Sequence, residues 1–156
     1  MRDGYVIINN LISKETCKQI KQEGLTLLDQ TGRNPFEGQQ TQRVYNVLSK
    51  TRITDQLAVH PHILGLMDRL FQPNFLLSQS QIINILSGEI AQSLHYDDAF
   101  YRLPRPRQPL GAATIWAIDD FTEDRWCLQS FDCVQKHCPT YPSHKAHGSC
   151  FLHHRQ

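Results

Sequence analysis

A histidine and an aspartate two residues apart, His95 and Asp97, are the residues whose types and spacing best suit metal chemistry. On an extended strand, residues at i and i+2 project from the same face, so an imidazole and a carboxylate would point toward one spot. Such a pair supplies two of the three ligands of the 2-His-1-carboxylate triad, which leaves positions on Fe(II) open for a cosubstrate and oxygen. Because H-x-D triplets are also common as ordinary surface residues, the surrounding elements decide the interpretation.

The residues that flank this pair have other expected roles. Tyr96 and Asp98 alternate to the opposite strand face, where Asp98 is expected to orient a ligand or to be structural. The next segment, FYRLPRPRQP, contains three prolines and cannot form a helix or a central strand. Its three arginines are expected either to be solvated or to form a rim that binds an anionic substrate, such as a carboxylate or a CoA phosphate. These arginines are Arg102, Arg105 and Arg107.

The chain has the size and composition of one globular domain. Of its 156 residues, 40% are apolar and 20% are charged, and the formal net charge is +1. This balance gives no field that would attract nucleic acid or a membrane, so neither partner is expected. The first four residues lack the apolar core of a signal peptide, no run is long enough to span a membrane, and Arg155-Gln156 is not a peroxisomal signal. These features predict a cytoplasmic protein of unspecified oligomeric state.

Helical patterns fall early in the chain, and strand patterns dominate the rest. Ser13 can cap a first helix that runs to about Gln30, Pro61 can occupy the first position of another, and a helical turn or two is expected between them. The expected strands cover residues 4–10, 43–48, 75–86, a piece ending in His95-Tyr96-Asp97, and 111–121, with a loop over 31–42. This order predicts an α+β fold with an antiparallel sheet.

Several segments together resemble the phytanoyl-CoA dioxygenase family; they are DGYVIINNLIS, TQRVYNVLSKT, QSQIINILSGE, LHYDDAFYRLPRPRQPLG and ATIWAIDDFTED. The resemblance runs from Asp3 to about Asp124. It implies a mainly β domain, a double-stranded β-helix (jelly roll) with N-terminal flanking helices. It also implies hydroxylation of a small or lipid-like organic substrate with Fe(II), 2-oxoglutarate and O2, and ascorbate as a candidate reductant. His95 and Asp97 would be iron ligands and the catalytic pair.

The resemblance also implies a pocket for 2-oxoglutarate. Arg43 and Gln81 match positions that contact this cosubstrate, and Trp116 matches a tryptophan that lines the same pocket. Asn84 is a further candidate, although on a regular strand it points away from the face of Gln81. A cation and amide donors suit a dianionic cosubstrate in a partly dry pocket. Without the family, Arg43 could equally lie at the surface, Gln81 could be a hydrogen-bonded residue of the sheet, and Trp116 could belong to the core.

The resemblance stops near Asp124. The family continues with Asn-Gly-Ala and an apolar strand, whereas residues 125–133 of this chain read RWCLQSFDC. Codons for Arg, Trp and Cys can encode Asp-Gly-Ala when they are read one base later. We therefore expect residues 1–124 to be a partial domain, and residues 125–156 to be out of frame and poorly ordered, through a splice variant, a frameshift or a gene-model error. Genomic or transcript sequence with no adjacent in-frame continuation would contradict this.

The change at Asp124 bears on the metal centre. In the family, the distal histidine ligand and the arginine that pairs with the far carboxylate of 2-oxoglutarate lie in the second half of the jelly roll, beyond this point. The chain would then offer His95 and Asp97 without a third ligand, and two ligands hold Fe(II) poorly. We therefore expect the 156-residue chain to have little or no dioxygenase activity.

Two alternative functions are open. Residues 126–156 carry four of the five cysteines and five of the eight histidines, and this composition suits zinc. A zinc site there would use Cys127, Cys133, Cys138, His144 and His147, although their spacings do not repeat the paired pattern of zinc sites. The whole chain could also be a non-catalytic binding or regulatory relative. Metal analysis with a turnover assay separates these alternatives.

Overall fold

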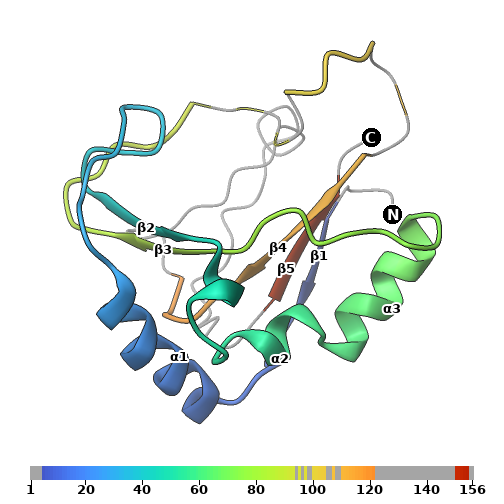
Figure 1. The fold of residues 1–156 in the computed structure, drawn as a ribbon, viewed down its shortest axis with the longest axis horizontal. Coiled ribbons are helices and arrows are strands. Elements are labelled where there is room, and N and C mark those ends of the chain that lie inside the picture. The colour runs from blue at the N-terminus through green and yellow to red at the C-terminus, as the bar shows by residue number, and fades with distance from the viewer. Residues whose placement is uncertain are drawn as a thin grey trace. The chain divides into compact units, whose positions relative to one another are not determined.

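The structure is a computed structural model that describes residues 5–93, 95, 97, 100–104, 107, 110–121 and the backbone of 150–154. The helices are α1 (Lys14–Leu27), a short 3-10 helix η1 (Val47–Ser49), α2 (Asp55–Ala58) and α3 (Pro61–Leu70). The strands are β1 (Tyr5–Ile8), β2 (Thr41–Tyr45), β3 (Gln81–Ile85), β4 (Ala112–Trp116) and β5 (Cys150–His154). Figure 1 shows these elements along the chain.

All the strand pairings among the described residues are antiparallel, which confirms the α+β prediction. β5 lies between β1 and β4 in a three-stranded sheet, and β2 pairs with β3 in a two-stranded sheet. The chain divides into two units, Gln19–Ser93 and the combination of Met1–Lys18 with Leu94–Gln156, and each is described by itself. The jelly roll stays a prediction.

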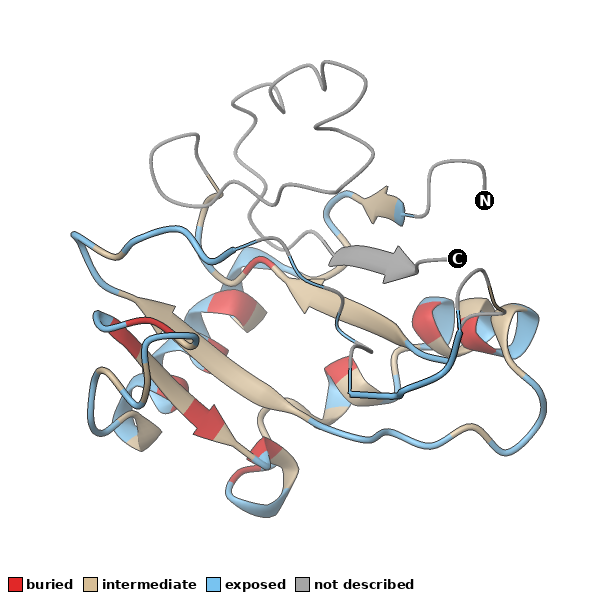
Figure 2. Ribbon diagram, turned by 90° about the horizontal axis from the view of Figure 1, so that it is seen from above, coloured by how far each residue is buried: buried red, intermediate tan, exposed pale blue. Residues whose placement is uncertain are grey.

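The core of the unit Gln19–Ser93 lies between α1 and one face of the β2–β3 pair. Val44 of β2 and Ile82 of β3 are cross-strand neighbours on this face, and Val44 is almost fully buried. Gly24 of α1 faces Ile82 so closely that a Cβ atom at this position would lie 3.2 Å from Ile82 Cδ1. The missing side chain therefore lets α1 approach β3. Figure 2 marks buried positions on β2 and on the helices.

The helix boundaries follow local signals in the sequence. Ser13 Oγ accepts a hydrogen bond from the backbone N–H of Thr16 at 3.0 Å, which confirms the predicted cap of α1. Pro61 occupies the first position of α3, where its missing N–H costs nothing, and Ile63 and Met67 form the buried side of that helix. α2 confirms the helical turn predicted before Pro61.

Two strand predictions on the β2–β3 pair had wrong boundaries. The strand expected over residues 75–86 begins only at Gln81, because its partner β2 ends at Tyr45, which lies opposite Gln81. Asn46 follows in the left-handed conformation with φ of 54°, which turns the chain away from the ladder. At the other end, β2 begins at Thr41, inside the predicted loop over 31–42, because Thr41 pairs with Ile85.

The prediction that the H-x-D pair ends a strand was also wrong. Residues 90–93 and His95 are not in a strand, and Asp97 lies in a turn. Among the described residues, none of the ladders extends to this segment, so strand alternation does not determine where these side chains point. β4 is shorter than the predicted 111–121, and β5 had no counterpart in the predicted strands.

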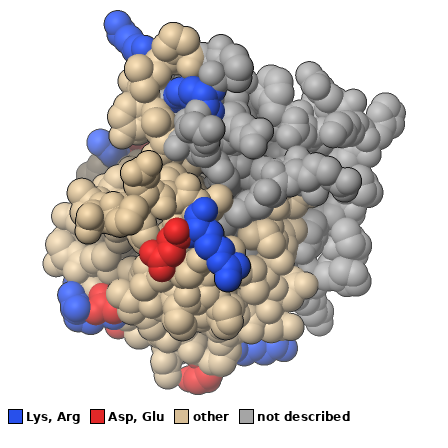
Figure 3. Space-filling model, turned by 90° about the vertical axis from the view of Figure 1, so that its right-hand side faces the viewer, with Lys and Arg blue, Asp and Glu red and all other residues tan. Residues whose placement is uncertain are grey.

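On the face drawn in Figure 3, basic and acidic side chains of the described residues are scattered among uncharged ones. None of the helices in the described part of the chain combines the length and the apolar character that a membrane crossing needs.

Candidate functional site

The candidate site in the unit Gln19–Ser93 is built on the face of β2–β3 opposite to Val44. Arg43 and Tyr45 project from this face of β2, and Gln81 and Ile83 project from the same face of β3. Arg43 Nη1 donates a hydrogen bond to Gln81 Oε1 at 3.2 Å. The structure therefore brings together two residues that were predicted to bind 2-oxoglutarate.

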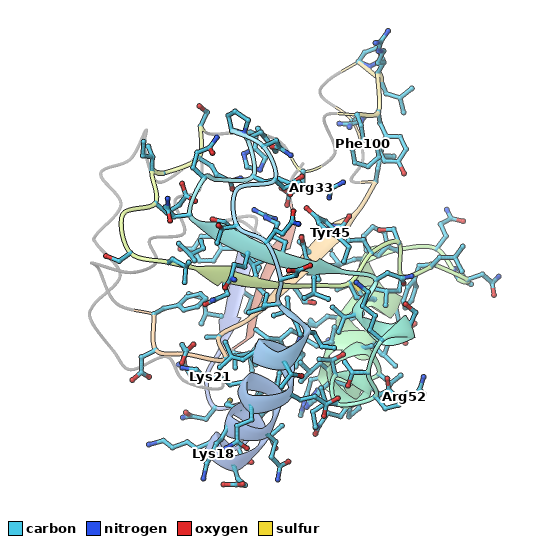
Figure 4. All side chains as sticks on the ribbon, turned by 60° about the vertical axis from the view of Figure 1, so that its left-hand side comes forward. Lys18, Lys21, Arg33, Tyr45, Arg52 and Phe100 are labelled. Atoms are coloured by element: carbon cyan, nitrogen blue, oxygen red, sulfur yellow. The ribbon has the colours of Figure 1, made fainter. Side chains whose placement is uncertain are left out.

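Glu37, in the loop before β2, supports this arrangement. Its backbone carbonyl accepts a hydrogen bond from Arg43 Nη2 at 3.3 Å, and its carboxylate Oε2 lies 3.9 Å from Arg43 Nε. The same carboxylate accepts hydrogen bonds from Tyr45 Oη at 2.6 Å and from Asn34 Nδ2 at 2.8 Å. Arg33 stacks on Tyr45 with its guanidinium carbon 4.8 Å from the ring centroid, and Figure 4 shows these two side chains side by side.

Near neutral pH this cluster holds two cationic arginines, Arg33 and Arg43, and one ionised carboxylate, Glu37. Burial alone would raise the pKa of the Glu37 carboxyl, but hydrogen bonds from Tyr45 and Asn34 and the charges of Arg33 and Arg43 outweigh it and hold the pKa below 4.5. Burial and the adjacent Glu37 raise the pKa of the Tyr45 phenol above 10.0. The Arg43 side chain is only 13% exposed. The cluster is thus a nearly buried cation beside an amide, which is suited to a carboxylate ligand.

The two other predicted cosubstrate residues are not on this face of the β2–β3 pair. Asn84 projects from the opposite face of β3, where its Nδ2 donates to Gln42 Oε1 at 2.8 Å. The structure therefore separates Asn84 from Arg43 and Gln81. Trp116 is the last residue of β4, opposite Cys150, in the other unit of the chain. The cosubstrate roles of all four residues stay predictions.

His95 and Asp97 lie close together although they are not on a strand. His95 Nε2 is 3.6 Å from Asp97 Oδ1, and the two side chains are 36% and 64% exposed. One metal ion could contact both atoms, because metal–ligand bonds to such atoms are about 2.1 Å long. The donor set, an imidazole and a carboxylate, also suits Fe(II). Among the described residues, no group of three or more His, Cys, Asp and Glu residues could hold a metal ion.

Several predicted residues fall outside the part of the chain that the structure describes. They include Tyr96, Asp98 and Arg105, and the proposed zinc ligands Cys127, Cys133, Cys138, His144 and His147. Of the remaining rim residues, Arg102 is exposed and Arg107 is partly buried. Both belong to the same unit as His95.

Sequence reasoning missed Glu89. The Glu89 carboxylate accepts hydrogen bonds from the backbone N–H groups of Gln39 at 3.2 Å and Gln40 at 2.6 Å, and from Thr41 Oγ1 at 2.7 Å. A Cβ atom at Gly38, where φ is 107°, would overlap this carboxylate. Glu89 therefore ties the start of β2 to the segment after β3, and no local pattern indicates a contact across so many residues.

The comparison with known protein families covers most of the chain. Residues 1–131 match the sequence pattern described as phytanoyl-CoA dioxygenase (PhyH). The chain belongs to the phytanoyl-CoA dioxygenase family. This result confirms the predicted resemblance, and the matched region extends past Asp124.

Two curated relatives from fungi are dioxygenases by name. The dioxygenase olcK of Penicillium canescens is 30% identical over 112 residues, which is 64% of this chain and 37% of the relative. The dioxygenase cdmA of Talaromyces verruculosus is 28% identical over 141 residues, which is 79% of this chain and 48% of the relative. The chain thus spans less than half the length of either relative. Family and relatives together support a dioxygenase-type function.

Proposed function

We propose that this family member carries part of the site of an Fe(II)/2-oxoglutarate-dependent dioxygenase that hydroxylates a small or lipid-like organic substrate. The observation that carries the proposal is the hydrogen bond between Arg43 and Gln81 on one strand face, inside the region matched to the family. We further propose that this region corresponds to part of a jelly roll, because its strands are antiparallel and helices lie near its start.

In this proposal each residue of the cluster has a separate task. Arg43 binds a carboxylate of 2-oxoglutarate, Gln81 orients that carboxylate through its amide, and Glu37 and Tyr45 hold the guanidinium in place. The low exposure of Arg43 strengthens the ion pair because water is largely excluded. Asn84, which bonds to Gln42 on the opposite strand face, is not needed for these tasks, and Trp116 is proposed to line the pocket as the family resemblance implies.

His95 and Asp97 are proposed to hold the iron, which when bound supplies the activation of oxygen. Their nitrogen and oxygen atoms are 3.6 Å apart and lie on a solvent-accessible segment. We expect turnover by the 156-residue chain to be low, because no third His, Cys, Asp or Glu among the described residues joins His95 and Asp97 to complete a metal site.

Calorimetric titration of 2-oxoglutarate in the presence of Mn(II), an inert substitute for Fe(II), tests the proposal without requiring turnover. We expect Arg43→Ala to weaken 2-oxoglutarate binding by about tenfold or more, because a charge-assisted contact is lost. The matched control Arg33→Ala, which removes an exposed arginine that stacks on Tyr45, should change the affinity by less than about threefold. Equal affinities of wild type and Arg43→Ala would contradict the proposed cosubstrate site.

The metal half of the proposal needs its own titration. Mn(II) binding should be weakened by His95→Ala and by Asp97→Asn, and unaffected by His62→Ala, which alters a histidine of α3. Succinate release with Fe(II), lost on His95→Ala, would show that the chain is an intact enzyme. Binding of 2-oxoglutarate without succinate release would instead support a non-catalytic relative, and stoichiometric bound zinc would support a site in residues 126–156.

A further inference from the structure

A cleft of about 250 Å³ lies between the loop before β2 and the segment after β3. Its lining includes Phe36 and Gln39 from the loop, and Glu89, Ile90 and Gln92 from the segment. All of these residues belong to the unit Gln19–Ser93.

The two walls of this cleft are tied to each other by hydrogen bonds. The Glu89 carboxylate accepts from the backbone N–H groups of Gln39 and Gln40. Gln92 Nε2 donates to the backbone carbonyl of Phe36 at 2.5 Å. A cleft held in this way is largely formed before a ligand enters, so little binding free energy is lost in ordering its walls.

The lining residues combine apolar surface with a single negative charge. Ile90 is 82% exposed and Phe36 is also exposed, so both offer apolar surface that a ligand can cover. The hydrogen bond from Thr41 Oγ1 lowers the pKa of the Glu89 carboxyl, with help from the backbone N–H groups of Ile90, Gln40 and Gln39, which keeps it ionised near neutral pH. Among the described residues that line the cleft, there is no lysine, arginine or histidine.

The cleft is joined by the chain to the proposed cosubstrate cluster. Phe36 lines the cleft, and the next residue, Glu37, contacts Arg43 through both its carbonyl and its carboxylate. A ligand in the cleft would therefore lie against the loop that holds Arg43. This connection suits a substrate site better than an unrelated surface pocket.

We propose that this cleft binds an apolar part of an uncharged organic substrate and discriminates against anionic molecules such as acyl-CoA esters and fatty acids. The apolar part of the lining, Pro35, Phe36, Ile90 and Ala91, supplies the affinity, and the Glu89 charge disfavours an anion in the same space. That the ligand is the substrate rests on the proposed function. The preference for an uncharged ligand is a property of the cleft and is tested separately.

Two fluorescent dyes with the same ring skeleton provide the test. N-phenyl-1-naphthylamine is uncharged near neutral pH, and 8-anilino-1-naphthalenesulfonate is the same molecule with one sulfonate added. We expect the wild-type chain to bind one molecule of the uncharged dye, and to bind it about tenfold more tightly than the sulfonate. Equal affinities, or tighter binding of the sulfonate, would overturn the proposal.

A pair of matched variants locates the dye. Ile90→Ser removes apolar surface from the cleft and should weaken binding of the uncharged dye by about five- to tenfold. Leu76→Ser removes a side chain that is 88% exposed and does not line the cleft, and should leave the dye affinity unchanged. Both positions are exposed, so both variants should fold, as circular dichroism can verify. Equal dye affinities of these two variants would overturn the proposal.

The dye titrations contain neither metal nor 2-oxoglutarate, so their outcome is independent of the cosubstrate and metal titrations. If the chain shows no preference for the uncharged dye but still binds 2-oxoglutarate, the proposal for the cleft is wrong and the proposed dioxygenase function is unaffected. If the chain prefers the uncharged dye but does not bind 2-oxoglutarate, the cleft is a site for uncharged ligands and the proposed dioxygenase function is wrong.

Discussion

Arg43 and Gln81 are positioned by paired strands, whereas His95 and Asp97 lie on a segment that is not in a strand. The Arg43 side chain is nearly buried and its guanidinium contacts both Gln81 and Glu37. Asp97, in contrast, is mostly exposed and lies 3.6 Å from His95. The Arg43–Gln81 pair and the His95–Asp97 pair are therefore held by different forces.

This difference shows what each part requires to be formed. A ladder fixes which residues are cross-strand neighbours, and burial then makes each hydrogen bond of the Arg43 cluster important for stability. An exposed contact such as that between His95 and Asp97 contributes little by itself, and a bound metal ion would add to the free energy that holds these two side chains together. The following variants test this contrast, from the largest expected effect to the smallest.

The largest effect is expected for Gly38→Ala, in the loop before β2 that is hydrogen-bonded to Glu89. An alanine would have to adopt φ of 107° and would overlap the Glu89 carboxylate, so we expect the free energy of unfolding to fall by about 3 kcal/mol. Gly88→Ala is the control, because Gly88 also has a positive φ but open space around it, and should cost about 1 kcal/mol. Urea denaturation measures both values, and equal losses would mean that Glu89 does not restrain this loop.

The Arg43–Gln81 pair and the His95–Asp97 pair can be compared directly through the free energies of unfolding of Arg43→Ala and His95→Ala, measured without metal. Removing Arg43 leaves Gln81 Oε1 and the Glu37 carbonyl without this donor, so we expect a loss of about 2 kcal/mol in the free energy of unfolding. Removing the partly exposed His95 should change it by less than about 0.5 kcal/mol. Similar losses for the two variants would show that the contrast is wrong.

The Arg43 cluster should also give stability a dependence on pH. Because the folded-state pKa of Glu37 is depressed, its contribution is present above the ordinary value of 4.5 and is lost as the pH falls through the folded-state pKa. Glu37→Gln should therefore be less stable than wild type near neutral pH, by about 1 kcal/mol, and the difference should shrink in acid.

Thermal melts across this acidic range measure the effect. Tyr45→Phe removes the donor of the 2.6 Å hydrogen bond to Glu37, so the acid transition of that variant should begin at higher pH than in wild type. Parallel melting curves for wild type and Glu37→Gln at every pH would contradict the assignment of this charge cluster.

The smallest expected effect concerns Asn84 and the binding of 2-oxoglutarate. Asn84 bonds to Gln42 on the opposite face of the strand pair, so Asn84→Ala should lower the free energy of unfolding by about 1 kcal/mol. It should leave the affinity for 2-oxoglutarate within about twofold of wild type, unlike Gln81→Ala. A large loss of affinity in Asn84→Ala would show that the two faces are not functionally separate.

The helices were predictable because their signals are local. Ser13 marks the start of α1 and Pro61 the start of α3, and both signals depend only on nearby residues. The antiparallel pairing of the strands also agrees with the order of the sequence patterns. The bounds of β3 were not predictable, since they depend on where β2, a distant partner, begins and ends.

The site was predictable only in part. The family resemblance indicated Arg43 and Gln81, and the structure places them in contact. Glu37 and Glu89 carry no such signal, because their carboxylates are bonded to residues that folding brings near, including backbone N–H groups almost fifty residues away. The expected strand at His95 failed because an alternating pattern cannot show whether a partner strand is available.

The contact of Glu89 with Gln40 has a consequence for the order in which the chain becomes protected. Pairing of Thr41 with Ile85 already closes the long loop between β2 and β3, so Glu89 adds its hydrogen bonds at little further cost in chain entropy. The amide protons of Gln39 and Gln40 should therefore exchange with solvent deuterium only when the ladder opens. Their slow exchange would report on the opening of β2–β3 from a position outside the strands.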